Sequence, residues 1–147
     1  MTLPAPMPLV TGETREFWAA AAEGTLLLRW CRRCDAAVWY PRTICPVCHE
    51  ADTYWRQASG TGTVYSYTVV RRAAGAYKDA APFVLAYVEL AEGPRIMTNL
   101  VGISPDSVRI GQAVHAVFDT AGPDAALVRF APSPETEAEK TEADNEG

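Results

Sequence analysis

The residues of this chain best suited to chemistry are its four cysteines, which form two C-x-x-C pairs. Cys31 and Cys34 make up the first pair, and Cys45 and Cys48 follow after ten further residues. Two residues between cysteines allow one tight turn to direct both sulfurs at a single point, and two such turns supply the four corners of a tetrahedron. The pattern therefore predicts one zinc ion bound by all four. Because sulfur fills every position, no place remains for a catalytic water, so the zinc is expected to be structural.

Disulfides and redox chemistry are the alternatives for these cysteines. The segment from Met1 to Val10 contains no Lys or Arg, so we expect neither a secretory signal nor an Arg-rich transit peptide. We therefore expect a cytoplasmic chain, and disulfides are rare in a reducing compartment. A redox C-x-x-C pair would need a thioredoxin-like βαβ setting. His49 is a further candidate ligand, but four cysteines already complete the site.

The residues around the cysteine pairs carry two further expectations. Asp35 and His49 follow the pairs, where the turn can require a positive φ, and both residue types tolerate that region better than most. The ten-residue spacer is long enough for a short hairpin over residues 37–43. Four neighbouring arginines either offset the negative charge of a four-thiolate zinc site or are simply exposed, and the sequence leaves both readings open. They are Arg29, Arg32, Arg33 and Arg42.

A short helix is predicted ahead of the cysteines. Thr11 can cap a helix over residues 12–23, which Gly24 would end. Phe17 and Trp18 each have an alanine four residues later, which gives the helix an apolar stripe. The stripe must pack either on the chain's own core or on a partner. We favour the partner, because a proline-containing arm over residues 1–10 would hold the helix away from the rest.

In the rest of the chain, short segments rich in β-branched and aromatic residues are separated by turn residues, a pattern typical of β-strands. We expect a mainly β chain, with a zinc ribbon followed by a five-stranded OB-fold barrel and a short N-terminal α-helix. The expected parts are an arm and helix (1–24), the ribbon (25–58), the barrel (59–132) and a disordered acidic tail (133–147). The ribbon strands are predicted at 26–30, 38–40 and 54–57, and the barrel strands at 63–70, 83–90, 96–101, 113–119 and 127–130, with a hairpin turn at 92–94.

Charge is unevenly distributed along the chain. Residues 133–147 contain six acidic residues and one lysine, which accounts for the whole net charge of −5. This tail lacks aromatic and large aliphatic residues, so we expect it to be disordered. The remaining residues balance at 12 acidic and 12 basic. A neutral folded part argues against binding to a nucleic-acid backbone. No uncharged stretch approaches the length of a membrane span.

The connection over residues 71–82 is long for a compact domain. It carries Arg71, Arg72, Tyr77 and Lys78 among small residues, a composition better suited to recognition than to packing. Arginine and lysine are the usual partners of phosphate groups. The two arginines follow a predicted strand, where neighbours point to opposite faces, so one of them is expected to face a ligand. The alternative is a mobile surface loop.

The sequence offers little for independent catalysis. All four cysteines are expected at the metal, and the two histidines are His49 and His115, the latter in a predicted strand. Nucleophile-elbow, phosphate-loop and H-E-x-x-H motifs are absent. Tyr65, Tyr67 and Tyr87 are candidates for stacking on bases, because zinc ribbons and OB-folds both serve in nucleic-acid binding. Strand tyrosines more often belong to ordinary barrel packing.

The chain resembles the DUF35 family, whose members have an N-terminal helix, a rubredoxin-like zinc ribbon and a C-terminal OB-fold. The cysteine quartet together with the glycines at 60 and 62 is the specific part of the resemblance, which extends over about residues 10–132. The matching positions are Phe17-Trp18, Glu23-Gly24, Leu26, Cys31-x2-Cys34, Pro41-Arg42, Cys45-Pro-x-Cys48, Trp55, Ser59 to Ser66, Pro82-Phe83, Val88 to Leu90, Gly93, Ile110-Gly111, Val114 and Phe130-x-Pro132.

This resemblance implies a role in acyl-CoA metabolism beside a catalytic partner. Family members accompany thiolase-like enzymes, aldolases of steroid side-chain degradation or hotdog-fold enoyl-CoA hydratases. We expect a non-catalytic accessory subunit, most similar to the aldolase-associated group, that supports assembly and shares acyl-CoA with its partner. Arg71, Arg72 and Lys78 are the candidate CoA contacts, and Phe17 and Trp18 the candidate partner contacts. The alternative is a protein that binds single-stranded nucleic acid.

Overall fold

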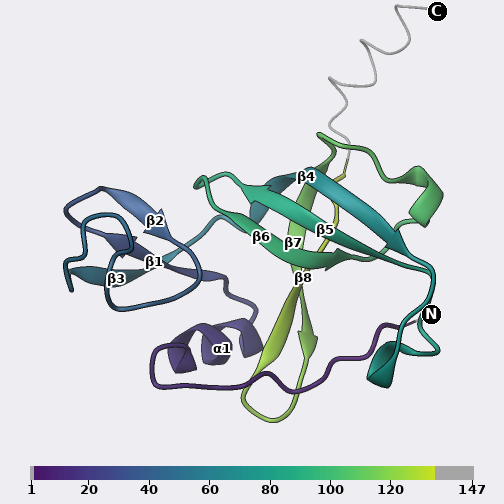
Figure 1. The fold of residues 1–147 in the computed structure, drawn as a ribbon, viewed down its shortest axis with the longest axis horizontal. Helices are drawn as coiled ribbons and strands as arrows, with labels where there is room; N and C mark the ends of the chain where they lie inside the picture. Colours follow the sequence, from purple (N-terminus) through teal and green to yellow (C-terminus); the bar gives the residue numbers. More distant parts are fainter. Residues whose placement is uncertain (1, 135–147) are drawn as a thin grey trace, which may run out of the picture.

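The computed structural model describes residues 2–134 and is mainly β, with one helix, a small sheet and a closed barrel (Figure 1). The small sheet has the order β2-β1-β3 and carries the cysteine turns. The barrel has the order β4-β5-β6-β8-β7, which confirms the predicted five-stranded barrel after a ribbon. The elements are α1 (Arg15–Ala22), β1 (Leu27–Cys31), β2 (Ala36–Val38), β3 (Thr53–Gln57), β4 (Thr61–Val70), η1 (Gly75–Tyr77), β5 (Phe83–Leu90), β6 (Arg95–Leu100), η2 (Pro105–Ser107), β7 (Ala113–Thr120) and β8 (Ala126–Pro132).

The barrel closes around alternating apolar side chains of its strands. Val84, Val88 and Ile96 are buried from β5 and β6, and Phe130 of β8 is fully buried among them. Neighbouring strands are antiparallel except β6 and β8, which are parallel and share the single pair Leu100–Phe130. The same core continues into the ribbon through Leu26 and Leu28. Ribbon and barrel are therefore joined by one apolar core.

Gly62 lies within β4, one residue before the strand start predicted at 63. A Cβ at this position would stand 2.6 Å from the carbonyl oxygen of Glu89 and 2.8 Å from Val88 Cγ1. Only a residue without a side chain allows β4 and β5 to approach so closely. The glycine thus serves the closure of the barrel.

We expect Gly62→Ala to lower the free energy of unfolding by about 1–3 kcal/mol, the usual cost of overpacking a tight site. Denaturant unfolding followed by circular dichroism measures it. Gly12→Ala is the matched control, because a Cβ at Gly12 meets no atom within 4 Å. Equal stability of the two variants would show that β4 can shift away from β5.

The helix begins later than predicted and packs on the chain itself. Thr14, not Thr11, precedes α1, and the Thr11 backbone N–H donates to Thr14 Oγ1 at 3.0 Å. Phe17 is 3 % exposed and Ala21 is fully buried, and α1 lies against β1, β7 and β8. The expectation that the proline arm holds the helix away from the rest is therefore wrong. The arm lies along the barrel and leads the helix back onto the core (Figure 1).

The predicted spacer hairpin is also wrong. Residues 36–38 form β2, which pairs with β1 across the first cysteine turn, so the hairpin spans the cysteine pair instead. Two polar contacts outside the strands join the parts of the chain. Glu13 accepts hydrogen bonds from the backbone and hydroxyl of Thr43 at 3.2 and 2.8 Å. Ser59 donates to Glu92 from its backbone N–H and its hydroxyl, both at 3.0 Å.

The predicted tail falls almost entirely outside the described residues. Ser133 is described, and its backbone N–H donates to the carbonyl of Ala113 at 3.0 Å. The expected disorder of the rest of the tail and the expected part boundaries stay predictions. Within residues 2–134, no helix has both the length and the apolar character needed to cross a membrane.

Candidate functional site

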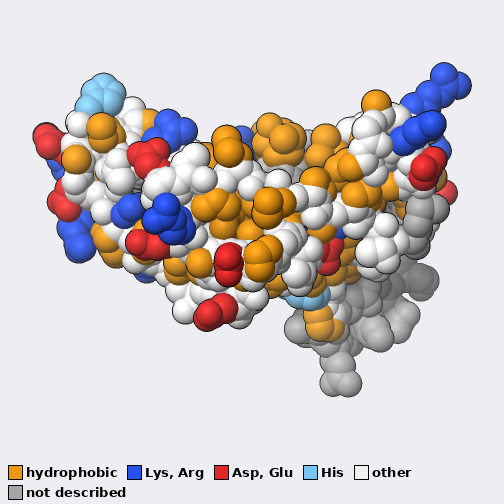
Figure 2. Space-filling view, turned by 90° about the horizontal axis from the view of Figure 1, so that it is seen from below, with side chains coloured by type: hydrophobic (Ala, Val, Ile, Leu, Met, Phe, Trp, Pro, Cys, Tyr) orange, Lys and Arg blue, Asp and Glu red, His pale blue; other side chains and the backbone are white. Residues whose placement is uncertain are grey.

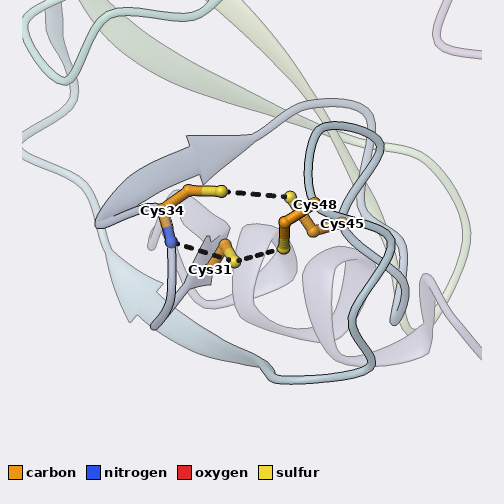
Figure 3. Close-up of side chains that lie close together, drawn as sticks. All are labelled: Cys31, Cys34, Cys45 and Cys48. Carbon is orange, nitrogen blue, oxygen red and sulfur yellow. Dashed lines mark hydrogen bonds between the residues drawn. The ribbon is translucent and has the colours of Figure 1, made fainter.

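The four predicted ligands come together at the outer end of the small sheet. Cys31 ends β1 and Cys34 follows in its turn, while Cys45 and Cys48 belong to the loop between β2 and β3 (Figure 3). Their sulfurs all lie within 4.8 Å of one another, with Cys31 and Cys48 at 3.6 Å and Cys34 and Cys45 at 4.0 Å. A disulfide would need about 2.05 Å. The corners of a four-thiolate metal site with bonds of about 2.3 Å lie about 3.8 Å apart.

The local backbone explains why the sulfurs converge. Asp35 and His49 have φ values of 48° and 62°, so the positive φ expected after each pair is present. Within each C-x-x-C turn a backbone N–H also points at the first sulfur, with Cys34 N–H donating to Cys31 at 3.5 Å and Val47 N–H to Cys45 at 3.4 Å. Such donors stabilise thiolates. The site therefore fits a metal ion held by four cysteines.

The thiols differ in acidity before a metal binds. Backbone N–H groups of Cys48 and Val47 lower the pKa of Cys45 to about 7. A hydrogen bond with Cys48, together with burial, raises the pKa of Cys34 to about 12. These environments favour ionisation of Cys45 ahead of Cys34, whose proton a metal ion has to displace. Since metal binding releases this proton, metal affinity rises with pH.

The arginines near the cysteines bind other groups. Arg29 lies 4.3 Å over the ring of Trp55, and Arg32 lies 4.1 Å over Tyr54 while pairing with Asp52 at 3.3 Å. The remaining contacts pair Arg33 with Glu50 at 2.9 Å and Arg42 with the carbonyl of Tyr40 at 3.3 Å. None of the contacts among residues 2–134 joins a guanidinium to a cysteine sulfur. These contacts stabilise the surface of the ribbon, and whether the arginines also offset the charge of the metal site stays a prediction.

Three cationic side chains stand free on the 71–82 connection. Arg71, Arg72 and Lys78 are all exposed, and none takes part in an ion pair or side-chain hydrogen bond among the described residues. β4 ends at Val70, so both arginines lie beyond the strand and the argument from strand alternation does not apply to them. The connection turns at Gly75, whose φ is 61°, and continues as η1. No contact joins the three cations to one another in this part of the chain.

An apolar groove separates the ribbon from this connection. It has a volume of about 350 Å³ and is lined by α1, residues 39–40, β6 and β8. Trp18 and Tyr40 line it together with Met97, which is 61 % exposed. Figure 2 shows hydrophobic side chains over the middle of one face and Lys and Arg side chains at both of its ends. Trp18 is thus available to a partner, whereas Phe17 is buried in the core.

Sequence reasoning missed the groove and the environment of Arg129. This arginine is 1 % exposed and reaches residues more than a hundred positions away. The groove joins residues from four separate segments, and no local pattern shows such a combination. The three tyrosines proposed to stack bases are exposed by 47 %, 38 % and 46 % at positions 65, 67 and 87. The ring of Tyr65 is already covered by Arg95, whose guanidinium lies 3.7 Å from its centroid.

Two family models match the chain in the order of its parts. One is described as the rubredoxin-like zinc ribbon domain of ChsH2 and matches residues 18–53. The other is described as the C-terminal OB-fold domain of ChsH2 and matches residues 55–119. A solved chain titled "Ltp2-ChsH2(DUF35) aldolase" is 36 % identical, with a TM-score of 0.75 over 85 % of this chain and 98 % of that one. The chain belongs to the DUF35 family.

The curated relatives that match this chain are named either as scaffold proteins or as alpha subunits of hydratases. A DUF35 domain-containing scaffold protein of Methanothermobacter thermautotrophicus is 38 % identical over 60 % of this chain and 67 % of its own length. The 3-oxo-4,17-pregnadiene-20-carboxyl-CoA hydratase alpha subunit of Mycobacterium tuberculosis is 38 % identical over 56 % of this chain and 24 % of its own length. The chain spans between 24 % and 67 % of the length of the curated relatives it matches.

Proposed function

We propose that this DUF35 chain is a non-catalytic accessory subunit of a thiolase-superfamily acyl-CoA enzyme. The observation that carries the proposal is its similarity over nearly the whole length of one chain of an Ltp2-ChsH2(DUF35) aldolase. An aldolase of steroid side-chain degradation is the proposed partner, since a further relative is named for a pregnadiene carboxyl-CoA. The subunit would support assembly and hold the CoA portion of the substrate. A hotdog-fold hydratase is the alternative partner.

The chemistry of the described residues supports a subunit without its own reaction. The four thiols are grouped as metal ligands. His115 lies in β7 with a buried Nδ1 that has no partner, and His49 stands in the second cysteine turn. Neither histidine shows a hydrogen bond to a nucleophile among residues 2–134. The metal we propose is one structural zinc, which supplies the tetrahedral anchor of the ribbon. Four cysteines without a disulfide also fit the reducing conditions of a cytoplasmic protein.

The exposed cations of the 71–82 connection and the apolar groove fit a shared CoA site beside a partner. CoA carries several phosphate charges, and Arg71, Arg72 and Lys78 are exposed cations without a carboxylate partner among the described residues. Arginine binds phosphate through two parallel donors, which favours this role over that of a simple surface charge. We propose that Trp18, at the apolar groove, contacts the partner subunit.

Co-purification from the native host tests the assignment of a partner. A tagged chain should retain a thiolase-superfamily subunit, identified by mass spectrometry, in a fixed molar ratio. Retention of a hotdog-fold hydratase would select the alternative partner. Recovery of nucleic acid with the chain, resistant to high salt, would instead support a nucleic-acid-binding function. A chain that remains alone in every preparation would contradict the proposal.

We expect the purified chain alone to show no turnover of any acyl-CoA, because its described residues lack a paired nucleophile and base. Product formation is measured by chromatography with the zinc-loaded chain at high concentration. Adding the partner should restore activity. Turnover that follows the chain through successive purification steps and is lost on His115→Ala would show that it is an enzyme.

A further inference from the structure

Arg129 is a buried cation that joins three separate segments. It lies in β8 and is 1 % exposed. Its Nη1 donates to the carboxylate of Asp119 on β7 and to the carbonyl of Leu3 at 3.4 Å. Its Nη2 donates to the carbonyl of Pro4 and to the hydroxyl of Tyr77 at 3.4 Å. The N-terminal arm and the 71–82 connection therefore meet at one guanidinium.

A guanidinium removed from water must find acceptors within the protein, because an unpaired buried charge is strongly unfavourable. Asp119 supplies one acceptor, and the arm supplies two backbone carbonyls. The carbonyls of Leu3 and Pro4 reach Arg129 only while the arm lies on the barrel. Arginine has five N–H donors, and one of the two on Nη2 reaches the Tyr77 hydroxyl, whereas the buried Nε has no partner among the described residues.

The arm is held at a second point by the turn between β7 and β8. Met7 Sδ lies 2.9 Å from the place that a Cβ would take at Gly122, whose φ is 94°. A side chain at Gly122 would force the Met7 side chain to move, so the turn and the arm lie in contact at this point. In Figure 1 the arm starts beside η1 and crosses the lower side of the barrel to α1. Two separate contacts thus fix its course.

Tyr77 connects this arrangement to the cations of the connection. Its ring lies 5.4 Å from that of Phe83, where β5 begins, and its carbonyl accepts the N–H of the buried Ala80 at 3.1 Å. Lys78 follows Tyr77 directly and points out to solvent. The hydroxyl held by Arg129 adds a polar contact to β8 beside the ring contact to β5. Fixing Tyr77 therefore fixes the turn from which Lys78 projects.

We propose that Arg129 is a positioning residue that uses the arm over residues 2–10 to fix Tyr77, and so sets the place of the cationic 71–82 connection. What the connection binds rests on the proposed function, whereas its positioning does not. Removal of the arm is then expected to increase the mobility of the 71–82 connection, although the two segments are distant in sequence.

Hydrogen exchange of residues 71–82 in the full zinc-loaded chain tests this coupling without any ligand. Tyr77→Phe keeps the ring and removes the hydroxyl, and it should speed exchange about fivefold, the loss of one ordinary hydrogen bond. A chain lacking residues 2–6 should show the same change or more. Trypsin cleavage after Arg72 and Lys78 should rise in parallel. Tyr87→Phe, an exposed tyrosine on β5, is the matched control and should change neither rate.

Unchanged exchange in the chain lacking residues 2–6 would overturn the coupling, and so would unchanged exchange in Tyr77→Phe. Faster exchange that extends equally through β5 would show loss of overall stability instead and would equally overturn it. CoA binding by the complex is then compared between the native chain and the Tyr77→Phe variant. If the coupling holds but both complexes bind CoA equally well, the connection is positioned for a ligand other than CoA. Failure of the proposed function and failure of the positioning are thereby separated.

Discussion

Cys34→Ala should abolish metal binding and unfold the ribbon sheet. The apolar cluster around the cysteine turns consists of Cys31, Val38 and Cys45, against which only Cys34 and Cys48 pack. Such a cluster is too small to hold two turns and the loop between β2 and β3 without metal–thiolate bonds. A structural zinc supplies on the order of 10 kcal/mol in small domains of this kind. Elemental analysis should give one zinc per chain for the native protein and none for the variant.

Val47→Ala is the control for this experiment. Val47 lies in the same turn and is 77 % exposed, and its backbone N–H, which donates to Cys45, survives the substitution. This variant should keep its zinc and its fold. Hydrogen exchange of β1 and β3 measures the ribbon separately from the barrel. Iron in place of zinc, or a ribbon that stays protected without metal, would contradict the assignment.

The metal site could be predicted because its information is local. The two-residue spacing within each cysteine pair determines the tight turn that brings its sulfurs together. Asp35 and His49, which tolerate a positive φ, indicate the backbone conformation that follows each pair. The barrel strands were also predictable, since apolar residues alternate along them. The prediction for β5 matches its observed bounds, and the other barrel strands differ from theirs by one or two residues at one or both ends. The place of Gly62 inside β4 could not be predicted locally, because the need for a glycine arises from Glu89 on the neighbouring strand.

The surface on which a helix packs could not be predicted in the same way. The apolar stripe on α1 shows that Phe17 must be buried, but it does not say against what. The answer lies largely in β7 and β8, which come much later in the sequence. Contacts between residues so far apart produce no periodic pattern in the sequence that could predict them. The exposed cations at Arg71 and Arg72 and the end of β4 at Val70 were predictable, yet the course of the connection after the strand was not, because the turn at Gly75 and η1 shape it.

In the assembled complex we expect Arg71→Ala/Arg72→Ala to weaken acyl-CoA use by about ten- to a hundredfold, seen as a rise in KM. Charge-assisted contacts are worth about 1.5–3 kcal/mol each, and about 1.4 kcal/mol is a factor of ten. Both side chains are exposed and lack partners among the described residues, so removing them leaves no buried charge behind. Folding, zinc content and assembly with the partner should therefore stay normal.

Arg15→Ala/Arg109→Ala is the matched control, because it removes the same charge from two other exposed arginines. If both double variants raise KM equally, long-range attraction of a charged substrate explains the effect, and the connection is not a contact. Loss of assembly in Arg71→Ala/Arg72→Ala alone would make the connection a docking element for the partner. Unchanged kinetics would leave these arginines as ordinary surface residues. Only a KM effect confined to Arg71 and Arg72, with kcat preserved, matches a contact to the CoA phosphates, because such a contact binds substrate and transition state alike.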